Sequence, residues 1–139
     1  MIMVDSGVWI DFFKKKINRE TDILKDLIRK NEYVVINYLI IMEVLQGKRH
    51  EKDYREAKEV LDNLRLLEID YNTILTAISI FRTCQKGIKQ NNITGQTLKT
   101  TDCIIASQCI ENDLPIFTRD KHFKMMQEFF PELKIYYKH

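Results

Sequence analysis

The sequence has few residues of the kinds that break, cross-link or anchor a chain. Its 139 residues include only 4 glycines and 2 prolines, so long disordered linkers are not expected. The three cysteines, Cys84, Cys103 and Cys109, form no CxxC pair, which favours free, mostly buried thiols in a reducing compartment. No apolar stretch approaches the length of a membrane span, and no basic segment precedes an apolar run at the start. We therefore expect a cytoplasmic protein without a membrane partner.

Excess charge of one sign is also absent. The 22 basic and 20 acidic residues leave a net charge of +2, whereas proteins that bind nucleic acid through bulk charge are usually more basic. The balance still allows a local basic rim around an acidic pocket. The hydrophobic fraction of 45% is ordinary for a globular protein, and the length suits a single domain, which we place at residues 1–139.

Short apolar strands alternate with longer helical segments along the chain. The strands that we predict are residues 2–4, 33–36, 66–69, 115–117 and 134–137. The predicted helices are residues 20–30, 39–45, 54–64, 71–84 (with Ile74, Leu75, Ile78 and Phe81 in register), 100–112 (capped by Thr100 or Thr101) and 121–130, and residues 8–13 are apolar at near-helical spacing. Residues 86–98, which include Gly87, are predicted to be a loop. The alternation predicts an α/β fold with a parallel sheet and helices on both faces.

Four carboxylates follow or neighbour these strands. Asp5 ends the first strand, Glu43 lies in the helix after the second, Asp102 lies in the first turn of a helix, and Asp120 follows the strand at residues 115–117. Ligands of open α/β sheets bind beyond the carboxyl ends of the strands, so we expect these acids to converge. Their mutual repulsion would be relieved by a divalent cation. Hard oxygen ligands without a His/Cys set favour Mg²⁺ or Mn²⁺, the ions of phosphodiester hydrolysis.

Each of these acids taken alone has an ordinary explanation. Asp5 can be a turn former or a helix cap, Asp102 a favourable acid in a first helical turn, and Asp120 the cap of the next helix. Glu43 lies among apolar neighbours in residues 40–45, and a lone acid in such a run is hard to bury without a partner. Only the combination indicates a metal site.

Three segments resemble PIN-domain proteins of the VapC toxin type. VDSGVWIDFF at residues 4–13 resembles the opening of that family, and IIMEVLQG at residues 40–47 resembles its second motif. TTDCIIASQCIENDLPIFTRDKHF, at residues 100–123, resembles its third and fourth motifs. The resemblance spans nearly the whole chain, and the motifs occur in the family's order. It implies a three-layer α/β/α domain with a central five-stranded parallel sheet.

The resemblance also implies a function, a metal and partners. It implies a Mg²⁺- or Mn²⁺-dependent endoribonuclease that is the toxin of a type II toxin–antitoxin pair. The family's acids map onto Asp5, Glu43, Asp102 and Asp120, with Asp5 and Asp102 contacting the metal most directly and Ser6 and Thr118 at supporting positions. The family implies a homodimer, inhibited by a small antitoxin that lies along a hydrophobic groove and places a basic side chain in the acidic pocket. The loop at residues 86–98 looks longer than in relatives.

Each of the other side chains near the acids has a functional and a structural interpretation. Lys99, Arg119, Lys121 and Lys124 flank Asp102 or Asp120 in the sequence. They could hold RNA phosphates or form a solvated charged face. His122 could assist proton transfer, although a surface or packing role is favoured. For Trp9, Phe12 and Phe13, core packing is favoured over base stacking for at least two of the three.

Three other functions are alternatives to a toxin nuclease. A PIN nuclease of RNA maturation would act without an antitoxin, and a small reading frame immediately upstream would distinguish the two. A catalytically idle binding module fits poorly with an intact acidic set. A phosphoacceptor receiver domain would need an acidic pair after its first strand, whereas Asp5 is followed by Ser6 and Gly7.

Overall fold

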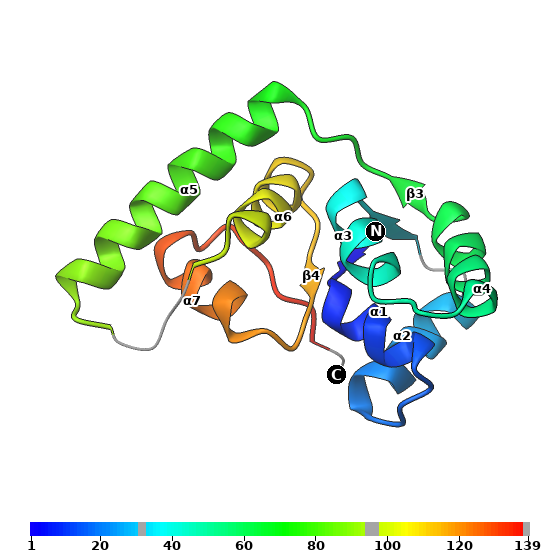
Figure 1. Ribbon diagram of the computed structural model, residues 1–139. Helices are drawn as coiled ribbons and strands as arrows, with labels where there is room; N and C mark the ends of the chain where they lie inside the picture. Colours follow the sequence, from blue (N-terminus) through cyan, green and yellow to red (C-terminus); the bar gives the residue numbers. More distant parts are fainter. Residues whose placement is uncertain (31–32, 94–97, 138–139) are drawn as a thin grey trace. The chain divides into compact units, whose positions relative to one another are not determined.

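The computed structural model describes residues 1–30, 33–93 and 98–137 (Figure 1). Contacts divide the chain into two compact units. Unit 1 comprises residues 1–68, 117–119 and 136–139, and unit 2 comprises residues 69–116 and 120–135. Whether residues 1–139 behave as one domain stays a prediction.

Strands and helices alternate along most of the chain, as predicted. The strands are β1 (Ile2–Val4), β2 (Val34–Ile36), β3 (Arg65–Leu66) and β4 (Ile116–Phe117). The helices are α1 (Ser6–Phe13), α2 (Arg19–Arg29), α3 (Tyr38–Leu45), α4 (Glu51–Asp62), α5 (Tyr71–Gln90), α6 (Thr100–Glu111) and α7 (Lys121–Phe129). Among the described residues, no helix is long and apolar enough to cross a membrane.

The sheet has the order β3-β2-β1-β4. Strands β1 and β2 pair in parallel with Ile2 opposite Val34, and β2 and β3 pair in parallel with Val35 opposite Arg65. Every residue of β1 and β2 is apolar and buried, as expected for parallel strands covered on both faces. These observations confirm the predicted α/β fold with a parallel sheet.

The described residues contain four strands where five were expected. The segment 134–137 forms only an isolated parallel bridge between Ile135 and Ile116, with the amide of Ile116 donating to the carbonyl of Lys134 at 2.9 Å. Because β4 is only two residues long, the last segment can pair with it through a single bridge.

Two helices of unit 1 begin directly where a strand ends. Asp5 follows β1 and caps α1, and Asn37 follows β2 and caps α3, each with extended backbone. Their side-chain oxygens accept hydrogen bonds from otherwise unsatisfied amides of the first helical turn. Trp9 on α1 is fully buried against the rings of Phe12 and Phe13, which confirms core packing for the tryptophan. These caps place the first turns of α1 and α3 at the ends of adjacent parallel strands.

Unit 2 is built from α5, α6 and α7, which contact one another. Helix α6 is buried from Asp102 to Cys109, and the three cysteines are buried thiols that form no disulfide, as predicted. The predicted cap of α6 was wrong, because Thr100 is already helical and Lys99 occupies the cap position without a side-chain hydrogen bond.

Helix α5 continues beyond the point at which a loop was predicted. Residues 86–90 are helical, so this part of the loop prediction was wrong. Residues 94–97 lie outside the described residues. Gly87 was predicted to lie in this loop, but it is buried in the helix, where a Cβ atom would lie 2.2 Å from Cε1 of Phe129 on α7. The glycine therefore permits close packing of two helices and does not end either of them.

Candidate functional site

The carboxylate of Asp5 is held by two hydrogen bonds in unit 1. Its Oδ1 accepts from the amide of Ser6 at 2.8 Å, and its Oδ2 accepts from the hydroxyl of Thr118 at 2.9 Å. The amide of Asp5 donates to the carbonyl of Phe117 at 3.0 Å, which sets the residues after β4 beside the end of β1. The side chain is buried, with 7% of its residue surface exposed. One bond to each oxygen fixes the orientation of the carboxylate.

Ser6 links Asp5 to a second acid. The hydroxyl of Ser6 donates to Oε2 of Glu43 at 3.0 Å, while its amide donates to Asp5. Glu43 comes from α3 and is half-buried. Unit 1 thus brings together Asp5, Ser6, Glu43 and Thr118, four residues that the sequence predicted to belong to one site, and their catalytic roles stay a prediction.

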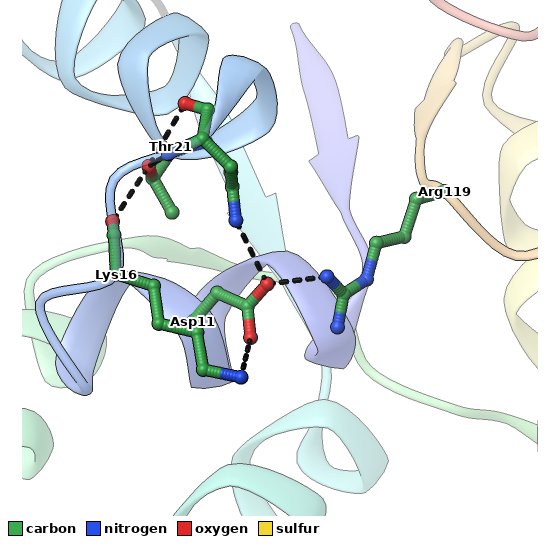
Figure 2. Close-up of polar contacts among 5 residues, drawn as sticks. Asp11, Lys16, Thr21 and Arg119 are labelled. Carbon is green, nitrogen blue, oxygen red and sulfur yellow. Dashed lines mark hydrogen bonds and ion pairs between the residues drawn. The ribbon is translucent and has the colours of Figure 1, made fainter.

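Unit 1 also contains an acid that sequence reasoning missed. Asp11 on α1 is 1% exposed, and its carboxylate is ion-paired with the guanidinium of Arg119. It also lies 3.5 Å from Nζ of Lys16 and accepts from Nδ2 of Asn18 at 3.1 Å (Figure 2). The signal was visible, because Asp11 is the only charged residue between Val8 and Phe13. The same reasoning had singled out Glu43.

Unit 2 places a second group of candidate side chains together. Nδ1 of His122 lies 2.8 Å from Oδ1 of Asp120 and 3.5 Å from Oδ2 of Asp102. Asp120 caps α7 and accepts from the amide of His122 at 2.9 Å, and Asp102 lies in the first turn of α6 with 6% of its surface exposed. One potential ligand atom from each residue lies within 4.8 Å of the other two.

The chemistry of these side chains suits a hard cation. Asp102 and Asp120 offer carboxylate oxygens, and His122 offers an imidazole nitrogen, which Mn²⁺ and Zn²⁺ accept more readily than Mg²⁺. No thiol joins them in the part of the chain that the structure describes. His122 can alternatively serve as a cation between the two acids when it is protonated.

The cysteine next to Asp102 is not a rival nucleophile. Burial, followed by the nearby Cys84 and Asp102, raises the pKa of Cys103 to about 12. Burial alone raises the pKa of Cys84 to about 11. Because the thiolate is the reactive form, neither thiol is suited to nucleophilic catalysis at neutral pH.

The predicted phosphate contacts differ in their surroundings. Lys99, Lys121 and Lys124 are exposed, at the start of α6 and on α7. The side chain of Arg119 is 48% exposed, but its guanidinium is paired with Asp11. The simpler interpretations of Asp5 and Asp120 as helix caps are confirmed.

Comparison with known proteins gives a consistent picture. The PIN-domain family matches residues 2–128. Ribonuclease VapC1 from Methanocaldococcus jannaschii is 28% identical over 136 residues, which cover 97% of this chain and 86% of that protein.

Two solved structures resemble the fold along the full length of both chains. A toxin–antitoxin complex from Klebsiella pneumoniae has a TM-score of 0.71 at 17% identity, with 100% of each chain covered. VapBC2 from Rickettsia felis, bound to a DNA fragment from its promoter, has a TM-score of 0.69 at 17% identity, again with 100% of each chain covered. At such identity the likeness supports the fold and nothing further.

Proposed function

Because this chain belongs to the PIN-domain family, we propose that it is a Mg²⁺- or Mn²⁺-dependent endoribonuclease and the toxin of a toxin–antitoxin pair. The observation that carries the proposal is that the motif acids are ordered and not merely present. Asp5 is fixed through both oxygens, and Asp102 is buried beside Asp120 and His122. The relative named ribonuclease VapC1 supports the activity. Proteins of the same fold occur in toxin–antitoxin complexes, and the role in such a pair is our proposal for this chain.

We assign the most direct metal contacts to Asp5 and Asp102, with Glu43 and Asp120 acting directly or through water. When bound, the ion supplies an activated water and stabilises charge on the scissile phosphate. Ser6 and Thr118 keep the carboxylate of Asp5 oriented for this task. His122 partly neutralises Asp102 and Asp120 when protonated. Such outer hydrogen bonds orient ligands and tune them.

A cleavage assay with matched variants tests the activity. We expect Asp5→Asn and Asp102→Asn each to lower cleavage of a mixed-sequence RNA by more than about 100-fold, beyond the effect typical of residues that only support a ligand. Asp113→Asn removes one carboxylate at an exposed position whose partner is Lys134, and it should remain fully active. EDTA should silence the wild type, and Mg²⁺ or Mn²⁺ should restore it. Full activity of either site variant, or cleavage without a divalent ion, would refute the proposal.

The RNA contacts that we propose for Lys99 and Lys121 can be tested through the salt dependence of RNA binding. Each lysine that neutralises a phosphate contributes to the salt dependence of binding. Lys99→Gln and Lys121→Gln should therefore raise KM and flatten its dependence on salt, with kcat little changed. Lys52→Gln on α4 is an exposed control. Equal effects of the control and the two variants would remove the assignment.

A protein partner is supported by an apolar surface on unit 2. Leu75 and Ile78 on α5 are 46% and 49% exposed. Next to them, a groove of about 230 Å³ between α5 and α6 is lined by Ile74, Ala77, Ile78, Phe81, Thr100, Cys103 and Ile104. Exposed apolar surface of this kind marks protein interfaces, and we propose that a second copy of the chain covers it. Ile78→Lys should give a monomer by light scattering, whereas Val60→Lys on α4 should not.

The antitoxin role is tested in cells. Expression of the chain should arrest growth, and coexpression of a small reading frame from immediately upstream should relieve the arrest. RNA cleavage without growth arrest, or without such a neighbour, would favour a nuclease of RNA maturation.

A further inference from the structure

We propose that Asp11 and Arg119 are positioning residues that hold Thr118 against the carboxylate of Asp5. The inference rests on the proposed function in one respect, namely that Asp5 takes part in catalysis. It reinterprets Arg119, whose place beside Asp120 in the sequence suggested a contact with RNA phosphate.

Three consecutive residues, beginning with the last residue of β4, contact α1 and its capping residue. The carbonyl of Phe117 accepts from the amide of Asp5 at 3.0 Å, and the hydroxyl of Thr118 donates to Oδ2 of Asp5 at 2.9 Å. The guanidinium of Arg119 pairs with Asp11 (Figure 2). Of these three contacts, the one from the hydroxyl of Thr118 acts on the carboxylate of Asp5 itself, and the other two fix the backbone on either side of Thr118.

The side chain of Arg119 follows the surface of α1. A Cβ atom added at Gly7 would lie 3.7 Å from Nε of Arg119, and its guanidinium ends at Asp11, one helical turn further on. Residues four apart lie on the same face of a helix, so the arginine follows the face of α1 that carries both Gly7 and Asp11. The planar fork of Arg suits a carboxylate better than the ammonium of Lys does.

Asp11 is built as a fixed anchor. It is 1% exposed, and a buried carboxylate is tolerated only when it is paired and hydrogen-bonded. Asn18, which bonds Asp11, also caps α2, and Thr21 closes this capping box while donating to the carbonyl of Lys16. The anion is thus held from the α1–α2 connection as well as from Arg119. Loss of Arg119 leaves Asp11 two other partners, so variants of Arg119 should still fold.

The test compares removal of either partner with removal of a neighbouring cation. The variants are Arg119→Gln, Asp11→Asn, their double variant, Arg119→Lys and the control Lys16→Gln. Lys16 approaches the same carboxylate at 3.5 Å, but it lies between α1 and α2 and not in the segment that carries Thr118. The probe is a fluorogenic RNA oligonucleotide of mixed sequence with Mn²⁺, and the second readout is amide hydrogen exchange of Asp5 by NMR.

We expect Arg119→Gln and Asp11→Asn each to lower kcat by about 10- to 100-fold, the range for groups that orient a ligand, with KM within about twofold of the wild type. The double variant should be no worse than either single one, because the two residues act as a unit. Arg119→Lys should recover part of kcat. The amide hydrogen of Asp5 should exchange faster in Arg119→Gln and in Asp11→Asn than in the wild type. Its exchange rate should be unchanged in Lys16→Gln.

Two results overturn the proposal. One is a raised KM in Arg119→Gln that Asp11→Asn does not share, because that pattern belongs to a phosphate contact. The other is unchanged kcat and unchanged exchange of Asp5 in both variants. If the wild type cleaves no RNA with Mn²⁺, the proposed function fails, and the exchange of the Asp5 amide still decides whether the pair positions the segment.

Discussion

Gly87 should be a helix position at which alanine destabilises the protein. Gly87 lies inside α5, where alanine is normally favoured over glycine by about 1 kcal/mol. A Cβ atom there would lie 2.2 Å, 2.5 Å and 2.9 Å from Cε1, Cζ and Cδ1 of Phe129. These distances are far below van der Waals contact, so the ring of Phe129 or one of the two helices must move.

The two effects oppose each other, and their sizes decide the sign. Overpacking of this kind costs about 1–3 kcal/mol, whereas the gain in helix propensity is about 1 kcal/mol. We expect Gly87→Ala to lower the free energy of unfolding by up to about 2 kcal/mol. In a Phe129→Ala background the obstructing ring is gone, and Gly87→Ala should raise the free energy of unfolding by about 0.5–1 kcal/mol.

Urea unfolding of the four proteins in this cycle measures the effect. The signals are far-UV circular dichroism for the helices and the fluorescence of Trp9, the single tryptophan, which is fully buried. Coincident transitions would license a two-state analysis. Gly47→Ala is the control, because a Cβ there would make only an ordinary contact of 3.8 Å. Stabilisation by Gly87→Ala in the wild-type background, or a coupling energy below about 0.5 kcal/mol, would refute the reasoning.

Three further predictions concern buried thiols and helix caps. At pH 8 only about 1 in 1000 of Cys84 and 1 in 10,000 of Cys103 would be thiolate, so iodoacetamide should label them only after unfolding. Asn37→Ala should cost about 0.5–2 kcal/mol in urea, because the fully buried Asn37 caps α3. Hydrogen bonds from Thr73 lower the pKa of Asp70 in the folded protein. The ionised Asp70 therefore stabilises the fold fully above pH 3.8, the ordinary pKa of the group, and this stabilisation is lost as the pH falls through the lowered pKa of the folded state. Acid titration of Asp70→Ala should therefore show a shallower loss of stability.

The fold could be predicted because its signals are local. The β1 and β2 segments are apolar throughout and end at Asp5 and Asn37, side chains that cap helices well. A buried strand followed by a cap specifies a βα unit without any knowledge of distant residues. Strand length was less predictable, since β4 and the segment after it depend on which partner lies alongside.

The buried face of α5 differs from the apolar stripe that the sequence shows. The sequence places Ile74, Leu75, Ile78 and Phe81 in register, but Leu75 and Ile78 are about half exposed. The buried stripe contains the small residues Thr73, Ala77 and Cys84, together with Ile80 and Ile88. Small side chains allow α5 to approach α6 closely, a benefit that hydrophobicity along one helix does not reveal.

The candidate site likewise contains residues that their sequence neighbours reveal and residues whose partners lie far away in the sequence. Asp5 and Asp120 were found because each follows a strand and precedes a helix, a position that the sequence shows directly. The partner of Arg119 could not be found in this way, since Asp11 lies 108 positions earlier, and an arginine beside an acidic motif is equally compatible with a phosphate. What the sequence did contain was a lone carboxylate in the apolar run from Val8 to Phe13. A charge there requires a buried counterion or a costly desolvation, so such a residue predicts that a basic side chain will be brought to it, although not which one. Arg119 meets that requirement. The buried charge of Asp11 on α1 therefore explains the pairing of Arg119 without any contact between the arginine and a substrate.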